Sequence, residues 1–204
     1  MDVLVPFSVT APKTRLAGIL SADERAEFAR TMLADVCTAI TDSGGSPTVL
    51  STEQFDCEWS LITDERPLTA AVNDRLDPPI AVVMADLALA TPTALSTLFD
   101  ADGEVVIAPG LGGGTNAIVV RHPDFYTDYH DTSLADHRRI AAEVGATVTE
   151  IDSFRLAVDI DEPEDLVELA LHGTGRASTW LEDAGVDLAL QPSGGRTTIT
   201  RDRD

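Results

Sequence analysis

Three aspartates stand at the ends of two apolar segments that lie far apart in the chain. Asp86 ends the run IAVVMAD, and Asp159 and Asp161 end RLAVDID. Residues two apart on a strand project to the same side, so Asp159 and Asp161 can share one ligand. Carboxylates brought together repel one another and raise their own pKa values unless a cation neutralises them. Because Mg²⁺ favours a few carboxylates together with substrate phosphates, these residues predict an Mg²⁺ site.

A plainer interpretation of the same aspartates stays open. An aspartate at the end of a strand often caps the next helix or lies in a solvated turn. Asp161 directly precedes EPEDL and so suits the N-cap of a helix. The two interpretations differ in whether Asp86 meets Asp159 and Asp161 in space.

Two cations follow the first apolar segment. Lys13, the only lysine of the chain, and Arg15 lie in APKTRL. A triphosphate bound among carboxylates needs such positive charge, and loops that follow strands hold phosphates in α/β folds. We therefore expect Lys13 and Arg15 to face a polyphosphate, although a solvated loop would carry the same residues.

A glycine-rich turn, GLGGGTN, is a further candidate for anion binding. Successive glycines, Gly112 to Gly114, let the backbone present N–H groups to a phosphate or carboxylate, followed by Thr115 and Asn116. A flexible hairpin turn would look the same, and no Walker spacing is present. Ser133 begins a predicted helix, where it can cap the helix or contact an anion. No Ser-His-Asp or Cys-His arrangement is evident.

Strand and helix patterns alternate along most of the chain and must position these residues. The pattern predicts an α/β fold: a three-layer sandwich with a mainly parallel mixed sheet, in which the pair flanking the glycine turn can add an antiparallel strand. In such sheets ligands bind beyond the carboxyl ends of the strands. The expected strands are 1–6, 46–52, 58–63, 80–86, 104–110, 117–122, 147–152 and 155–161. The expected helices are 22–43, 67–76, one from Thr91 or Pro92, 132–146, 162–172 and 177–185.

Length and charge exclude several classes of protein. With 204 residues and 44% apolar content, the chain can bury one good core. A formal charge of −21, spread over the whole length, argues against nucleic acid or an anionic membrane as a partner and is typical of a salt-adapted protein. We find no signal peptide or spanning segment and expect a cytoplasmic location.

Four motifs in order give a resemblance to a known family. The segments VPFSVTAPKTRL, MADLALATP, GGGTNAI and AVDIDEPEDL together resemble the archaeal 2-phospho-L-lactate guanylyltransferases of deazaflavin coenzyme biosynthesis, relatives of the molybdopterin cofactor nucleotidyltransferases. The resemblance implies one nucleotidyltransferase domain over residues 1–172, with the nucleotide-diphospho-sugar transferase-like (Rossmann-like) fold. Residues 173–204 lie outside the resemblance, and their pattern predicts a C-terminal helix and a loose tail. The resemblance also implies a homodimer.

The resemblance assigns a role to each motif residue. GTP and a small phosphorylated hydroxy acid would be the substrates, and pyrophosphate a product. Asp86, Asp159 and Asp161 would hold two Mg²⁺ ions, and Lys13 and Arg15 would face the triphosphate. The acceptor and nucleotide would meet a set of polar and glycine residues: Asn73, Gly114, Thr115, Asn116 and Ser133.

Two residues depart from the family pattern, and the first departure should not affect metal binding. This chain has Ala88 where the family usually has proline, and His130 where a glycine is common three residues before Ser133. The second departure puts the shape of the acceptor pocket in doubt. Phosphoenolpyruvate, 3-phosphoglycerate or a sugar phosphate as acceptor, another nucleotide, and a non-catalytic nucleotide-binding module all remain open.

Overall fold

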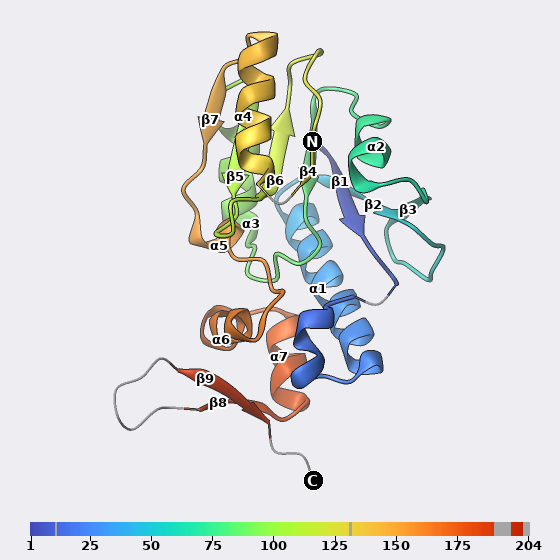
Figure 1. The fold of residues 1–204 in the computed structure, drawn as a ribbon, viewed down its shortest axis with the longest axis vertical. Coiled ribbons are helices and arrows are strands. Elements are labelled where there is room, and N and C mark those ends of the chain that lie inside the picture. The colour runs from blue at the N-terminus through green and yellow to red at the C-terminus, as the bar shows by residue number, and fades with distance from the viewer. Residues whose placement is uncertain (11, 131, 190–196, 202–204) are drawn as a thin grey trace.

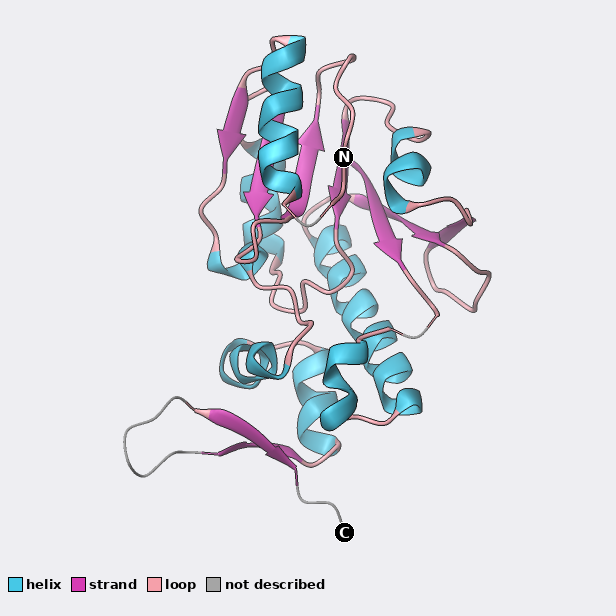
Figure 2. Ribbon diagram, in the orientation of Figure 1, coloured by secondary structure: helices cyan, strands magenta, loops and turns pink. Residues whose placement is uncertain are grey.

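The computed structural model describes residues 1–10, 12–130, 132–189 and 197–201, and a mixed sheet forms its centre (Figures 1 and 2). The strands of this sheet are β1 (Asp2–Phe7), β2 (Ser46–Ser51), β3 (Ser60–Thr63), β4 (Ile80–Val83), β5 (Val105–Pro109), β6 (Thr115–Val120) and β7 (Val148–Glu150). Their spatial order is β3-β2-β1-β4-β6-β5-β7. β6 runs antiparallel to β4 and β5, and the other neighbours are parallel. The expected antiparallel strand is therefore confirmed.

Helices cover both faces of the sheet. They are α1 (Ala22–Asp42) and α3 (Pro92–Asp100) on one face, and α2 (Leu68–Asn73) and α4 (Ser133–Val144) on the other. Alternate residues of β1 pack on opposite faces: Val3 and Val5 join the core with α1 and α3, whereas Leu4 joins the core with α2 and α4. Helices on both faces of the sheet confirm the predicted three-layer sandwich. A strand covered on both faces has to be apolar throughout, which explains the continuous apolar runs in the sequence.

A third core lies beyond the carboxyl ends of the parallel strands. It joins the 3-10 helix η1 (Thr14–Gly18), the first half of α1, α6 (Pro163–His172) and α7 (Arg176–Asp183). Figure 1 shows these helices gathered at the end of the sheet toward which β1 points. The predicted capping box at the start of α1 is present, since Ser21 and Glu24 bond each other's backbone N–H groups. No helix in the described part of the chain combines the length and apolarity that a bilayer crossing requires.

The predicted strand over 155–161 is wrong. This segment begins as the short helix α5 (Phe154–Ala157) and then runs extended across the end of the sheet. Its backbone bonds loops instead of a strand: Ala157 O accepts from Leu111 N at 3.0 Å, and the N–H of Ile160 donates to Asp86 O at 3.1 Å. The apolar alternation that suggested a strand serves burial, because Leu156, Val158 and Ile160 face the core.

The C-terminal segment is more ordered than predicted. After α7, strands β8 (Val186–Ala189) and β9 (Thr198–Arg201) form an antiparallel hairpin, so the expectation of a loose tail is wrong for residues 198–201. Arg201 fastens the hairpin to the N-terminal region, donating to Ile19 O at 2.9 Å and to both carboxylate oxygens of Glu24. The loose tail was predicted over 193–204, and its residues 193–196 and 202–204 lie outside the described residues.

Candidate active site

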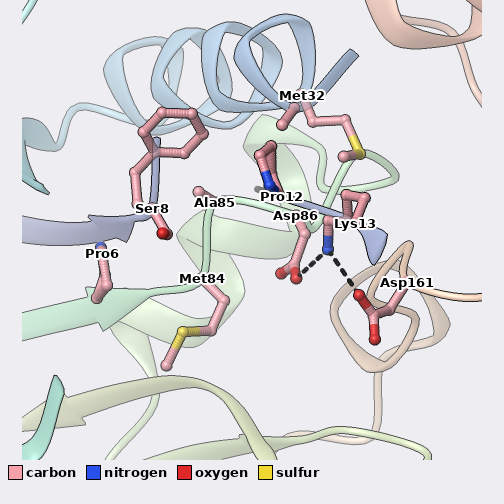
Figure 3. A pocket seen from close by; sticks show the side chains of 11 residues that line it. Pro6, Ser8, Pro12, Lys13, Met32, Met84, Ala85, Asp86 and Asp161 are labelled. Atoms are coloured by element: carbon pink, nitrogen blue, oxygen red, sulfur yellow. Dashed lines mark hydrogen bonds and ion pairs between the residues drawn. The ribbon is translucent and has the colours of Figure 1, made fainter. Parts of the chain in front are cut away.

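Lys13 joins two of the predicted carboxylates. Its Nζ lies 2.7 Å from Asp86 Oδ2 and 3.5 Å from Asp161 Oδ1 (Figure 3). The lysine side chain is only 10% exposed, whereas those of Asp86 and Asp161 are 28% and 33% exposed. Lys13 therefore meets two residues that lie 73 and 148 positions away in sequence, and all three belong to the predicted site.

The backbone of Lys13 is in an unusual conformation. With φ at 55° and ψ at 43°, Lys13 is the one residue other than glycine in the described chain that has a positive φ. A side chain in this left-handed region costs about 1–2 kcal/mol. Such strain gathers at functional sites, where the surrounding structure holds it in place. Here it lets η1 begin directly after Lys13 while the amine turns back to Asp86.

Asp86 carries an oxygen that no protein group satisfies. Asp86 Oδ1 is buried and has no hydrogen-bond partner among the described residues, whereas Oδ2 accepts from Lys13. A buried carboxylate oxygen without a partner is costly, so this atom calls for a cation or a donor that the chain itself does not supply.

Asp159 lies in the same electrostatic environment. Burial raises the pKa of Asp159 above its ordinary value, and the charge of Asp86 raises it further. The amide of Asn116 donates to Asp159 Oδ1 at 3.3 Å and to the backbone oxygens of Leu156 and Ala157 at 3.1 Å each. Asn116 thus holds the irregular segment at the edge of the sheet and aims the Asp159 carboxylate.

The carboxylates suit a divalent cation in chemistry, but they do not form a ready-made cage. No three His, Cys, Asp or Glu side chains in the described part of the chain are grouped closely enough to hold a metal ion. The pair Asp86 and Asp159, with one unsatisfied oxygen and mutual repulsion, suits a hard cation that takes its remaining ligands from phosphates. Asp161 is held instead by Lys13 and by Arg15, whose Nη1 lies 2.8 Å from Asp161 Oδ2.

Two adjoining cavities open beside Lys13 and Asp86. The first has a volume of about 200 Å³ and is lined by residues that include Lys13, Asp86 and Asp161 (Figure 3). The second, of about 250 Å³, lies over β2 and α2. They share the lining residues Pro6, Phe7, Ser8 and Met84. The pair forms one cleft across the carboxyl ends of β1 and β4.

Asp64 and Thr52 line the second cavity. Asp64 is held by Arg66 and Arg75, with Asp64 Oδ2 2.6 Å from each guanidinium, and the hydrogen bonds of Arg66 hold the pKa of Asp64 well below its usual range. Thr52 Oγ1 is buried and has no partner among the described residues. Neither residue was predicted from the sequence, in which the one signal near them is the charged run DER directly after β3.

The predicted acceptor residues Thr115 and Ser133 are not among the residues that line these cavities. Thr115 and Ser133 are 4% and 2% exposed, and Thr115 N donates to Ser133 Oγ at 2.9 Å. Ser133 therefore ties the glycine turn to the start of α4; the N-cap is Thr132. A Cβ atom added at Gly114 would lie 4.0 Å from Ser133 Oγ. Neither hydroxyl lines the cleft formed by the described residues.

Asn73 uses its whole amide within the protein. Its Oδ1 accepts from the N–H of Thr127 at 2.7 Å and from the Thr127 hydroxyl at 2.9 Å, while its Nδ2 donates to Thr127 O at 2.8 Å. The structure does not bring Asn73 to the carboxylates.

Asp161 is not the N-cap of α6, which was the plainer interpretation of this residue. The N-cap is Glu162.

The chain is similar in sequence to one family of known proteins over nearly its whole length. The model of a family described as "Guanylyl transferase CofC like" matches residues 1–202. A 2-phospho-L-lactate guanylyltransferase of Halomicrobium mukohataei is 61% identical, with 98% of this chain and 100% of that protein covered. One from Methanoregula boonei is 45% identical, with 97% and 94% covered.

Solved structures support the fold. A nucleotidyl transferase from Methanothermobacter thermautotrophicus superposes with a TM-score of 0.58 at 14% identity, covering 89% of this chain and 98% of that one. A Desulfovibrio desulfuricans G20 protein, described as a candidate nucleotide-diphospho-sugar transferase, gives a TM-score of 0.69 at 13% identity, covering 89% and 94%. At these identities the similarity extends to the fold alone, which is the predicted one.

Proposed function

The chain belongs to the guanylyl transferase CofC-like family, and we propose that it transfers the GMP unit of GTP to 2-phospho-L-lactate and releases pyrophosphate. The relatives that carry this enzyme name match over nearly their whole length. The observation that carries the proposal is the unsatisfied oxygen of Asp86, which lies beside Asp159 and the Lys13 amine at the mouth of a cleft. A bound cation, or a hydrogen-bond donor from a ligand, would satisfy this oxygen.

The triphosphate suits the first cavity. Lys13 supplies a buried cation there, and Arg15, 64% exposed, can swing from Asp161 toward an incoming phosphate. The carboxylates of Asp86 and Asp159 would hold Mg²⁺, with Asp161 beside them. When bound, Mg²⁺ would neutralise the phosphates and align the attacking and leaving oxygens.

The nucleoside suits the second cavity. Its walls are largely apolar, with Leu50, Leu68 and Ala71 on one side and Met84 shared with the first cavity. Its polar lining includes the Thr52 hydroxyl and the Asp64 carboxylate, and both offer acceptor oxygens. A base that presents N–H donors, as guanine does, complements such a wall.

The reaction needs no general base from the protein. The nucleophile is a phosphate oxygen of the acceptor, and a phosphate monoester has its second pKa near 6, so it is already largely dianionic at neutral pH. The role of the chain is to hold the acceptor phosphate in line with the α-phosphorus and to stabilise the charge on the departing pyrophosphate.

A pyrophosphate-release screen tests the proposal. GTP, ATP, CTP and UTP are each combined with 2-phospho-L-lactate, phosphoenolpyruvate, 3-phosphoglycerate and a sugar phosphate in the presence of Mg²⁺. Highest kcat/KM with GTP and 2-phospho-L-lactate is the expected result. Preference for another acceptor would change the substrate and keep the reaction class. Nucleotide binding without pyrophosphate release from any pair would overturn the enzymatic proposal.

Three further expectations remain proposals. The two-metal requirement rests on the carboxylates just described, and a homodimer and a cytoplasmic location rest on the resemblance and on the sequence. The charge of −21 favours a protein that works at high salt.

A further inference from the structure

His137 is a buried histidine that the proposed transfer reaction does not use. It lies on α4, is 0% exposed, and contacts Tyr129 edge-on with ring centroids 5.1 Å apart and Phe125 at 6.1 Å. The sequence analysis gave it no role. Its two ring nitrogens each have one partner, and these partners define its state.

The hydrogen bonds assign the tautomer. The backbone N–H of Asp128 donates to His137 Nε2 at 3.0 Å, so Nε2 carries no proton. Burial lowers the pKa of His137 to about 4, against the opposing charges of Asp128 and Asp136, so the ring is neutral near pH 7. The single ring proton is therefore on Nδ1, and Nδ1 donates to Thr115 Oγ1 at 2.8 Å.

This donation leaves the Thr115 hydroxyl proton free. An oxygen that accepts from His137 cannot point its own proton at His137, and that proton has no acceptor among the described residues. Thr115 is only 4% exposed, so a donor without a partner is unfavourable there unless a ligand completes it. The neighbouring residue, Asn116, holds Asp159 from the other face of β6.

We propose that His137 is a positioning residue that orients the Thr115 hydroxyl as a donor to the phosphorylated acceptor, which would lie in the open space beside the glycine turn and outside the two cavities described above. The inference rests on the proposed function, which supplies the acceptor. His137 does not touch the substrate in this account; it acts through Thr115. A purely structural role would instead require only that both ring nitrogens be satisfied.

Two variants separate these roles because each removes one of the two hydrogen bonds. In His137→Asn the amide nitrogen takes the place of Nδ1, so the donation to Thr115 is kept and that from Asp128 is lost. In His137→Gln the amide takes the place of Nε2, so the Asp128 bond is kept and that to Thr115 is lost. Both variants are expected to lose similar stability, which thermal melting checks.

Steady-state kinetics then distinguish the variants. One neutral hydrogen bond corresponds to about a 3- to 10-fold change, so the acceptor KM should rise by about that factor in His137→Gln and stay within about 2-fold in His137→Asn. The KM for GTP should not change in either. In a Thr115→Val background, His137→Gln should have no further effect on the acceptor KM. Equal acceptor KM values in the two variants, or additive effects in the double mutant, would overturn the inference.

The wild-type protein provides a check that needs no variant. Long-range ¹H–¹⁵N NMR of the imidazole nitrogens should show the Nδ1-protonated neutral form of His137 at pH 6, and the Nε2-protonated form would overturn the inference even if His137→Gln does not fold. Wild-type enzyme that turns over while His137→Gln matches it would leave the proposed function standing and remove the role of His137. Wild-type enzyme that releases no pyrophosphate with any acceptor would overturn both.

Discussion

The Nζ atom of Lys13 lies 2.7 Å from Asp86 Oδ2, and the other oxygen of the same carboxylate is buried without a partner. One half of Asp86 is thus neutralised by the protein and the other half is left for a ligand. This division explains how the Asp86 carboxylate can be partly buried at the edge of the sheet and still be available to bind a cation.

Replacing Asp86 by Asn should abolish the reaction and leave the fold intact. The amide keeps the size of the side chain but removes the charge that a divalent cation needs, so pyrophosphate release should fall by about 100-fold or more. Asp100→Asn, at the exposed end of α3, is the matched control and should keep wild-type turnover. Near-normal turnover of Asp86→Asn would refute the assignment.

The strained backbone of Lys13 predicts an order of stability for two inactive variants. Lys13→Ala and Lys13→Gly lose the same ion pairs, but only glycine adopts a positive φ without steric cost. The glycine variant should therefore be more stable by about 1 kcal/mol in urea denaturation. Both should be inactive with GTP. An alanine variant as stable as the glycine variant would show that the left-handed conformation is absent in solution.

Asp159→Asn should stabilise the metal-free protein at neutral pH. Because the folded-state pKa of Asp159 is raised, its ionised form is disfavoured by folding, and this cost is present at pH values above the folded pKa. The gain in melting temperature from Asp159→Asn should shrink as the pH falls through that pKa toward 3.8, the ordinary pKa of an aspartate. Melting curves between pH 7 and pH 4 measure this in the presence of a chelator, and a destabilised variant at pH 7 would contradict it.

Thr52→Val should weaken GTP binding without affecting the acceptor. Its buried hydroxyl has no partner among the described residues, so a nucleoside in the second cavity is expected to supply one. We expect the KM for GTP to rise by about 3- to 10-fold and that for the acceptor to remain unchanged. Thr31→Val is the control, because the Thr31 hydroxyl donates to the backbone oxygen of Glu27 within α1 and does not line the cavity. Equal changes in both KM values would place the nucleoside elsewhere.

Salt should stabilise the protein. The formal charge of −21 produces self-repulsion in the folded state, which mobile ions screen. The melting temperature should rise between about 0.1 M and about 1 M KCl, over which the screening length falls from about 10 Å to about 3 Å. Sucrose at equal osmolality controls for osmotic effects. A melting temperature that does not change with KCl would remove the case for salt adaptation.

The sequence was sufficient for the fold, and it singled out Lys13, Asp86 and Asp161 as site residues, but not the ion pairs that Lys13 makes with the two carboxylates. Apolar runs such as IAVV and VVIA are buried on both faces, and Ser21 with Glu24 marks the start of α1 unambiguously. The error at residues 155–161 has a physical cause. Period-two burial depends on an extended backbone with one side against a core, and that does not require a neighbouring strand.

The polar interior was not predictable in the same way. His137 bonds Thr115, which is 22 residues away, and Asn73 bonds Thr127, which is 54 residues away. Thr52 is notable because its hydroxyl has no partner among the described residues. Neither spacing nor composition reports such pairings. The β8–β9 hairpin was missed for a related reason, since its hold on Glu24 through Arg201 spans 177 residues.

The position of Lys13 also determines how the molecule responds to amine-directed reagents. Apart from the α-amino group, the chain has a single primary amine, and that amine is nine-tenths covered and paired with two carboxylates. Acylating dyes or biotin esters should therefore attach first at Met1, leaving a singly tagged enzyme that still turns over. On longer exposure, slow acylation of Lys13 should reduce activity. A nucleotide bound in the cleft should slow this loss.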